Sequence, residues 1–289
     1  MRILITGGQG QLGRALQRAL AGHEVFAPGH RELDITDAAL VRHHVESFRP
    51  QLVMNAAAWT DTAGCEADPQ RAHLVNSEGA RYLAEACAGM DAALLHVSTN
   101  EIFDGHQALP YREDDEANPL NTYARSKWEG ERYVRELSHQ HYIVRTSWLY
   151  GAGRASFPEK IIQAAREKGA LKVVTDEIAS PTWTVDLAQA IAQLITRPAW
   201  GVYHLTNSGH CSRLDWARKT LELAGLGHLR VEPTTQAEFG APYRKPPYSA
   251  LANQNAACLG ITLRPWEEAL SAYFAEQHTA KTNTPRLGS

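Results

Sequence analysis

The sequence has few of the features that mark secreted, metal-binding or membrane-spanning proteins. Its four cysteines are scattered and show no Cys-x-x-Cys or Cys/His ligand spacing, so we expect reduced thiols and no bound metal. Its apolar runs are shorter than the roughly 18 residues that a membrane-spanning helix needs. The formal net charge of −3 gives no general attraction to nucleic acid or to an anionic membrane. We therefore expect a cytoplasmic protein that binds neither nucleic acid nor membrane.

What the sequence does contain is an ordinary globular composition, with 44% hydrophobic and 21% charged residues. Short apolar runs alternate with helical patterns, and the first run begins at residue 2, which is not the pattern of a signal peptide. The runs that we expect to form strands are 2–6, 24–27, 51–58, 92–99 and 142–151. Strands that alternate with helices predict an α/β fold with a doubly wound parallel sheet of the Rossmann type.

A glycine-rich turn follows the first predicted strand. Its glycines, Gly7, Gly10 and Gly13, have the spacing Gly-x-x-Gly-x-x-Gly, and a helical pattern begins at Leu12. Glycines let the backbone approach a pyrophosphate, which then lies at the amide end of the helix. The turn therefore predicts dinucleotide binding, and the alternative is a plain strand-to-helix turn.

The residues after the second predicted strand bear on which cofactor binds. NAD-selective folds often place an acid there to bind the ribose hydroxyls, whereas this chain has Pro28, Gly29, His30 and Arg31. Arg31, together with His30, would meet a 2′-phosphate, which favours NADPH and leaves NADH as the second choice. The alternative is that Arg31 is a surface residue in a loop.

Small and hydroxyl side chains end two of the predicted strands. Ala57 and Ala58 end one, and Ser98 and Thr99 end the next. Ligands of open α/β sheets bind at the carboxyl ends of the strands, so we expect these residues at the ligand site. Tight packing between a strand and a helix would explain the alanines equally well, and a turn or helix cap would explain the hydroxyls.

Tyr123 and Lys127 open a predicted helix over residues 123–137 and lie four residues apart, hence on one face. A free phenol has a pKa of about 10, and a nearby ammonium would lower it by favouring the phenolate. A phenol tuned in this way exchanges a proton with a carbonyl oxygen while hydride moves to or from the carbon. Most such pairs are a half-buried ring beside a solvated lysine, but this one accompanies a glycine turn and Ser98-Thr99.

The pattern changes in the second half of the chain. Short helices, short strands and proline-rich loops there predict a smaller α+β lobe, partly interleaved with the first. We assign residues 1–150, with returning segments near 182–206, to a dinucleotide-binding domain. Residues 151–181 and 207–277 would form a substrate-binding lobe, and the polar residues 278–289 a flexible tail.

With these motifs described, nearly the whole chain resembles the extended short-chain dehydrogenase/reductases, and within them the dTDP-4-dehydrorhamnose reductase family. The resemblance rests on Gly7-x-x-Gly10-Gln11-Leu12-Gly13, Leu33-Asp34-Ile35-Thr36-Asp37, Asn55-Ala56-Ala57-Ala58, Ser98-Thr99, Phe103-Asp104-Gly105, Pro119-Leu120-Asn121-x-Tyr123-x-x-x-Lys127, Arg145-Thr146-Ser147-Trp148-Leu149-Tyr150-Gly151, Ser180-Pro181-Thr182 and Arg244-x-Pro246-x-Tyr248-Ser249. Any one of these motifs is a modest signal, and all of them in this order are hard to obtain by chance.

The resemblance implies a role for each matching position. In cofactor binding, it places Gly7, Gly10, Gln11, Leu12 and Gly13 at the pyrophosphate, Asp34 and Ile35 at the adenine, and Ala57, Ala58 and Trp59 at the nicotinamide ribose. In catalysis, Tyr123 would donate the proton, Lys127 would hold the ribose hydroxyls and tune Tyr123, and Thr99 would bind the sugar carbonyl. Trp148 would pack on the sugar nucleotide, and Arg244 would clamp its diphosphate.

Two residues depart from the family pattern in the sugar pocket. After Ser-Thr the family usually shows Asp-Tyr-Val-Phe, whereas this chain has Asn100, Glu101, Ile102 and Phe103. Asn100 keeps an amide for the sugar hydroxyls but lacks a charge, and Glu101 replaces an aromatic ring. The departure bears on the identity of the sugar more than on the chemistry.

Together, the residues and the resemblance predict a reductase that transfers hydride from NAD(P)H to C4 of a nucleotide-linked 4-keto-6-deoxysugar. The favoured substrate is dTDP-4-dehydro-L-rhamnose, and the product dTDP-L-rhamnose serves carbohydrate biosynthesis. One alternative is a catalytically silent, cofactor-binding regulatory subunit that resembles the β-subunit of methionine adenosyltransferase. Another is a nucleotide-sugar epimerase or dehydratase, although a dehydratase normally needs an acidic pair where this chain has Asn100-Glu101. We expect a monomer or a homodimer.

Overall fold

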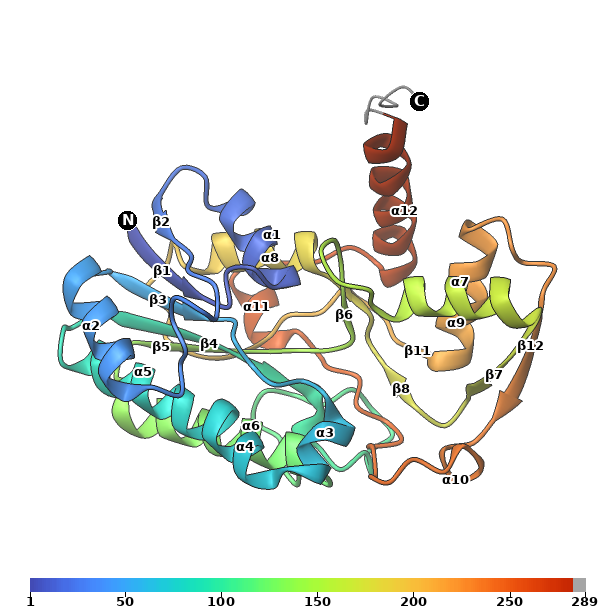
Figure 1. The fold of residues 1–289 in the computed structure, drawn as a ribbon, viewed down its shortest axis with the longest axis horizontal. Helices are drawn as coiled ribbons and strands as arrows, with labels where there is room; N and C mark the ends of the chain where they lie inside the picture. Colours follow the sequence, from blue (N-terminus) through green and yellow to red (C-terminus); the bar gives the residue numbers. More distant parts are fainter. Residues whose placement is uncertain (283–289) are drawn as a thin grey trace.

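The computed structural model describes residues 1–282, and its larger lobe is built on a six-stranded parallel sheet (Figure 1). The strands are β1 (Arg2–Thr6), β2 (Glu24–Phe26), β3 (Leu52–Asn55), β4 (Ala93–Thr99), β5 (His141–Thr146) and β10 (Gly201–His204). Their order is β10-β5-β4-β3-β1-β2, and every pair of neighbours is parallel. The order reverses between β1 and β3, as in doubly wound sheets. The predicted fold class is therefore confirmed.

Helices cover both faces of this sheet, because successive strand residues point to opposite faces. Ile3 and Ile5 of β1 pack into one apolar core, and Leu4 packs into the other. The first core includes residues of α1 (Gln11–Ala19), α8 (Thr184–Leu194) and α11 (Gln254–Cys258), and the second those of α2 (Ala38–Phe48), α5 (Gly79–Ala88) and α6 (Thr122–Leu137). Since both faces are buried, the strands are nearly continuous apolar runs.

The second lobe contains a two-stranded parallel ladder with helices beside it (Figure 1). Its elements are α7 (Phe157–Lys168), β7 (Ala170–Val174), α9 (Arg213–Leu223), β12 (Arg230–Thr234), α10 (Gln236–Phe239) and α12 (Trp266–Thr282). Two short ladders join β6 (Leu149–Tyr150) to β9 (Thr182–Trp183) and β8 (Ile178–Ala179) to β11 (Cys211–Ser212). An aromatic cluster that includes Trp216 and Trp266 packs α9 against α12.

The chain passes between the lobes more often than the sequence predicts. As expected, α8 and β10 return to the first lobe after the excursion into the second. However, Ala256 and Ile261, which fall in the predicted substrate segment, also pack into the core of the first lobe. Helix α12 continues to Thr282, so residues 278–282 are helical rather than a tail, and residues 283–289 lie outside the described residues. Within the described residues, no helix combines the length and apolarity that crossing a membrane requires.

Helix α6 is held against its neighbours by two buried contacts. A Cβ added at Gly130 would lie 2.4 Å from the carbonyl oxygen of Asn76, so only glycine lets α6 come this close to the π-helical turn η1 (Leu74–Glu78). The next residue of α6 is Glu131, whose Oε2 lies 2.9 Å from Nη2 of Arg145 on β5. These contacts fix the first turn of α6, which reaches the carboxyl edge of the sheet.

Candidate active site

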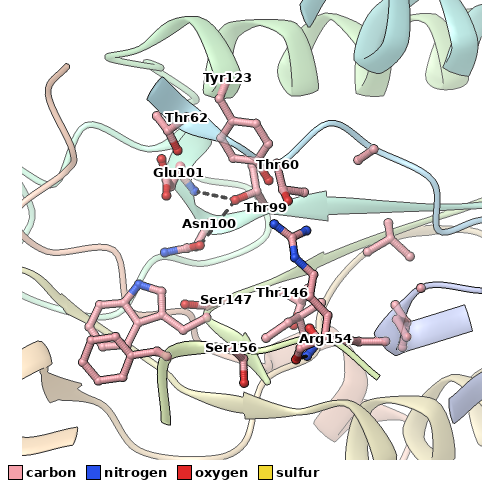
Figure 2. A pocket seen from close by; sticks show the side chains of 18 of the residues that line it. Thr60, Thr62, Thr99, Asn100, Glu101, Tyr123, Thr146, Ser147, Arg154 and Ser156 are labelled. Atoms are coloured by element: carbon pink, nitrogen blue, oxygen red, sulfur yellow. Dashed lines mark hydrogen bonds between the residues drawn. The ribbon is translucent and has the colours of Figure 1, made fainter. Parts of the chain in front are cut away.

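A cavity of about 710 Å³ lies at the carboxyl edge of the six-stranded sheet, with residues of both lobes in its lining. This is a size typical of small-molecule sites. Figure 2 shows one wall with Thr60, Thr62, Thr99, Asn100, Glu101 and Tyr123, the facing wall with Thr146, Ser147 and Ser156, and the guanidinium of Arg154 extending between them. Ser98, Thr146 and Ser147 belong to the lining, and their hydroxyl oxygens are buried without a hydrogen-bond partner in the described chain.

The glycine turn forms one end of this cavity. Gly7 has a φ of +68°, and a Cβ there would lie 2.9 Å from the amide nitrogen of Ala57. A Cβ at Gly13 would lie 2.3 Å from the carbonyl oxygen of Gly7, so the helix packs directly on the turn. Gly10 is the N-cap of α1 and provides no side-chain hydrogen bond to the first amides. Those amides face the cavity end of the helix, where a pyrophosphate would bind.

Gln11 links the glycine turn to the loop that follows β6. Its Nε2 donates to the carbonyl oxygens of Gly151 at 2.8 Å and of Arg154 at 2.7 Å. Gln11 lines the cavity, and its side-chain amide ties the glycine turn to that loop.

The small residues after β3 form the floor next to the glycine turn. Ala56 and Ala58 line the cavity, and Ala57 packs against the turn at Gly7. Asn76 holds the next residue, since its Oδ1 accepts from the amide of Trp59 at 2.9 Å and its Nδ2 donates to the carbonyl of Trp59 at 3.0 Å. The backbone over these residues is thereby fixed without bulky side chains entering the cavity.

Thr99 and Tyr123 come together at the end of β4. Asn121 caps α6 by accepting from the amide of Ala124 at 2.8 Å, which places Tyr123 in the first turn of the helix, at the cavity. The hydroxyl of Thr99 accepts from the amide of Glu101 at 3.2 Å. Burial raises the pKa of Tyr123 strongly, the carboxylate of Glu101 adds to the rise, and a hydrogen bond with Thr99 opposes it. The phenol therefore keeps its proton at neutral pH.

Lys127 lies one turn further along α6 and is almost fully buried. Its Nζ donates to the carbonyl oxygen of Val97 at 2.7 Å and lies 3.3 Å from Nε2 of His96. Burial lowers the pKa of Lys127 to about 8, and the carboxylate of Glu131 opposes this shift. The expectation that Lys127 lowers the pKa of Tyr123 is wrong for this structure, because burial of the phenol dominates.

Aromatic rings and an arginine form the wall that the second lobe contributes. The rings of Trp148 and Trp216 stack with centroids 5.4 Å apart and an interplanar angle of 8°. The guanidinium of Arg213 lies 3.6 Å from the centroid of Trp148 and is paired with Glu177 at 3.1 Å. All three groups, Trp148, Arg213 and Trp216, line the cavity.

The loop after β2 lies outside the cavity lining. His30 and Arg31 are exposed, and His30 Nε2 lies 3.8 Å from a carboxylate oxygen of Asp34. Burial raises the pKa of Asp34, but hydrogen bonds from Thr36 outweigh it, so the pKa lies below its usual value. Ile35 is buried in the core. The structure therefore places His30 and Arg31 at the surface, with His30 beside Asp34, and Asp34 takes part in a local turn.

The sequence profile of the family described as "RmlD substrate binding domain" matches residues 1–279. The chain belongs to this family. It is 42% identical to the dTDP-4-dehydrorhamnose reductase of Streptomyces griseus, over 94% of this chain and 93% of that one. It is 40% identical to the spore coat polysaccharide biosynthesis protein SpsK of Bacillus subtilis, over 96% and 99% of the two chains. A crystal structure of the Bacillus anthracis dTDP-4-dehydrorhamnose reductase in complex with NADP matches with a TM-score of 0.92 and 35% identity, over 95% and 99% of the two chains.

Arg244, which the resemblance places at the diphosphate of the substrate, does not line the cavity. The side chain of Arg244 is exposed, and only its carbonyl oxygen contacts the site, by accepting from Asn121 Nδ2 at 2.9 Å. The neighbouring Lys245 enters the cavity instead and lies 3.1 Å from a carboxylate oxygen of Glu101. Arg244 and Lys245 are consecutive residues of the proline-rich loop, and of the two only the side chain of Lys245 faces the cavity.

The sequence did not identify several cations of the cavity, namely Arg154, Lys160, Arg213 and Lys245. Lys245 could have been identified from the sequence, because it belongs to the motif that begins at Arg244. Lys160 and Arg213 lie in amphipathic helices of the second lobe, where a basic residue gives no signal of its own. Among the described residues, no group of three or more His, Cys, Asp or Glu side chains is arranged to hold a metal ion.

Proposed function

We propose that this chain is an NADPH-dependent reductase that transfers hydride to C4 of dTDP-4-dehydro-L-rhamnose and so forms dTDP-L-rhamnose. The observation that carries the proposal is the meeting of Thr99, Tyr123 and Lys127 with the glycine turn in one cavity. The reductases among the relatives support the reaction, and the relative with bound NADP supports the cofactor.

The residues of the turn fit a dinucleotide. Gly7 and Gly13 leave no room for a side chain, and the first turn of α1 has amides without a side-chain cap. Leu12, Ala57 and Ala58 would lie along the cofactor beyond its pyrophosphate. Exposed Arg31 with His30 would meet the 2′-phosphate that distinguishes NADPH from NADH.

When bound, the cofactor supplies a hydride from its nicotinamide to the sugar carbon. Tyr123 then donates its phenolic proton to O4 as the hydride reaches C4, so that the ketone becomes an alcohol and no charge is left on oxygen. Thr99 positions the same oxygen with its hydroxyl. Lys127, whose Nζ donates to the carbonyl oxygen of Val97, would bind the ribose hydroxyls of the cofactor. General acid catalysis of this kind contributes about 10²–10⁴-fold.

The cations of the second lobe, together with the ring of Trp148 near the end of residues 1–150, suit a nucleotide diphosphate. Arg154, Lys160 and Arg213 line the cavity and would neutralise the two phosphate charges. Trp148 presents its ring to the same space, where it would pack on the sugar nucleotide. Asn100, whose Nδ2 donates to Ser249 Oγ at 2.6 Å, would contact the sugar.

We also propose that the two lobes bind the cofactor and the substrate separately, as predicted from the sequence. Residues 1–150 and the returning segment near 182–206 would hold the cofactor, and the second lobe would hold the substrate. The cytoplasmic location and the monomeric or homodimeric state stay predictions.

The test follows absorbance at 340 nm with purified protein, NADPH or NADH, and enzymatically prepared dTDP-4-dehydro-L-rhamnose. We expect a loss of absorbance that requires both protein and sugar and is faster with NADPH. The absence of any loss with either cofactor would contradict the proposal. A control with the 4-hydroxy sugar dTDP-L-rhamnose and NADP⁺ should run the reaction in reverse.

The two alternatives have less support. A silent regulatory subunit has no need for Thr99, Tyr123 and Lys127 to reach one cavity, and the relatives named as reductases favour catalysis. A dehydratase would use an acidic pair after Thr99, whereas Asn100 is bonded to Ser249 and only Glu101 is acidic. An epimerase retains its NAD through purification, so cofactor-free protein would exclude it.

A further inference from the structure

Glu101 is the single acidic side chain in the described lining of the cavity. Five basic residues share that lining, namely Lys127, Arg154, Lys160, Arg213 and Lys245. Cations suit the diphosphate of a nucleotide sugar, but a carboxylate repels it. Binding of phosphate therefore does not explain why an acid faces this cavity. A different part of the ligand would have to contact Glu101.

The carboxylate of Glu101 is fixed from two sides. Its Oε1 lies 3.1 Å from Nζ of Lys245, and its Oε2 accepts from Nδ2 of Asn121 at 3.1 Å. A carboxylate oxygen has two lone pairs, so each oxygen can accept one more hydrogen bond. The side chain is 12% exposed and lies in the cavity wall shown in Figure 2. Glu101 thus presents oriented acceptors to a ligand that carries hydrogen-bond donors.

Glu101 also lies next to the place proposed for the reacting carbonyl. Its backbone amide donates to the hydroxyl of Thr99 at 3.2 Å, and its charge acts directly on Tyr123. Thr99 and Tyr123 are the two groups proposed to hold the carbonyl oxygen. A hydroxyl on a ring carbon close to that carbonyl would come within reach of the carboxylate, and such a bond to a charged acceptor is stronger than a neutral one.

We propose that Glu101 is a specificity-determining residue whose carboxylate accepts a hydrogen bond from a sugar hydroxyl near the reacting C4 carbonyl. The inference rests on the proposed reductase function and deepens it, because it names the substrate group that the site reads. A site with a buried acceptor rejects a sugar that lacks the matching hydroxyl, since the acceptor is then left unpaired. The alternative is a structural role, in which the ion pair between Glu101 and Lys245 acts as a strut that joins the two lobes.

The experiment compares kcat/KM for dTDP-4-dehydro-L-rhamnose with kcat/KM for its 2-deoxy and 3-deoxy analogues. For the wild type, we expect one analogue to be poorer by about 10²-fold or more. Glu101→Gln should lower kcat/KM for the hydroxylated sugar and leave that analogue nearly unchanged, so the ratio falls to about tenfold or less. Lys245→Met, which removes the strut but keeps the carboxylate, should lower both values together and preserve the wild-type ratio.

Three outcomes separate the explanations. A wild-type ratio retained in Glu101→Gln, with NADPH binding intact by fluorescence, would overturn this inference and leave the reductase standing. A ratio that collapses equally in Lys245→Met would also overturn it, in favour of the strut. No NADPH oxidation by the wild type with any of the sugars would overturn the proposed function, and the inference with it.

Discussion

The ammonium of Lys127 lies between the carbonyl oxygen of Val97, at 2.7 Å, and Nε2 of His96, at 3.3 Å. The tautomer of His96 is fixed by the contact of its other ring nitrogen, Nδ1, which faces away from Lys127. Asn55 accepts from the amide of Ala57 through Oδ1 at 3.2 Å, so its Nδ2 points to Nδ1 of His96 at 3.1 Å. Nδ1 is then an acceptor, and the ring proton lies on Nε2, facing Lys127. Two donors face each other while Lys127 is charged, which favours its neutral amine.

Lys127→Met should stabilise the protein at neutral pH. Burial lowers the pKa of Lys127 from 10.5 to about 8, with Glu131 opposing. Below about pH 8 the folded state therefore holds a costly buried charge, and this cost disappears as the pH rises towards 10.5. We expect the variant to gain about 1–3 kcal/mol at pH 7, measured by urea unfolding, and to lose this gain near pH 10.5. Lys172→Met, at an exposed site, should show no such pH dependence; an equal gain at both pH values for Lys127→Met would contradict the explanation.

Tyr123→Phe should keep the cofactor and lose turnover. The phenol is the proton donor in the proposed mechanism, whereas the ring makes the packing contacts. We expect kcat to fall by about 10²–10⁴-fold while the Kd for NADPH stays within about twofold. Stopped-flow absorbance and cofactor fluorescence measure the two quantities. Near wild-type reduction by the variant would rule out this role for Tyr123.

Gly13→Ala should weaken cofactor binding. A Cβ at this position would lie 2.3 Å from the carbonyl oxygen of Gly7, so α1 has to move away from the turn that is proposed to bind the pyrophosphate. Gly22→Ala is the matched control, because its Cβ would meet nothing within 4 Å. We expect a tenfold or larger rise in the Kd for NADPH, or about 1.4 kcal/mol, for the first variant alone. Equal affinities for both variants would show that the turn does not bind the cofactor.

Arg145→Met should be more damaging than the double variant Arg145→Met/Glu131→Met. Both members of this ion pair are fully buried, at 1% and 0% exposure. Removing Arg145 leaves the buried charge of Glu131 with only the partly exposed Arg135, 3.6 Å away, as its cationic partner. Losing the main partner of a buried charge costs about 3–5 kcal/mol, whereas two apolar residues of similar volume avoid that cost. Denaturant unfolding of the single and double variants measures the difference. If the double variant were as unstable as the single one, lost packing rather than unpaired charge would be the cause.

Local signals in the sequence located most elements of the first lobe. Helix α2 begins directly after Asp37, whose side chain accepts from two backbone amides, and an acid at an N-cap is a signal that the sequence carries. Residues 69–88, by contrast, form α4 (Pro69–His73), η1 and α5 in succession. The π-helical turn there contains Asn76, which clamps Trp59, and such a contact leaves no mark in the local pattern.

The site was predictable where it depends on strand ends and was not where it depends on the meeting of lobes. Thr99 could be placed at the ligand site because it ends a strand, and the carboxyl ends of parallel strands share one edge of the sheet. The family motif placed Tyr123 with it. Lys245 and Arg213 reach the cavity only through the path of the second lobe, which no spacing in the sequence encodes. The raised pKa of Tyr123 likewise depends on burial and on Glu101, which only the assembled structure provides.

The close approach of α6 at Gly130 has a consequence for how new members of this family arise. Because that glycine and the buried ion pair hold α6 on the sheet, Tyr123 and Lys127 belong to the same rigid body as the glycine turn. The groups proposed to contact the sugar nucleotide, such as Trp148 and Arg213, are supplied by later segments of the chain. Evolution, or a designer of chimeras, can therefore exchange those segments to recruit a different sugar while inheriting the reductive chemistry intact.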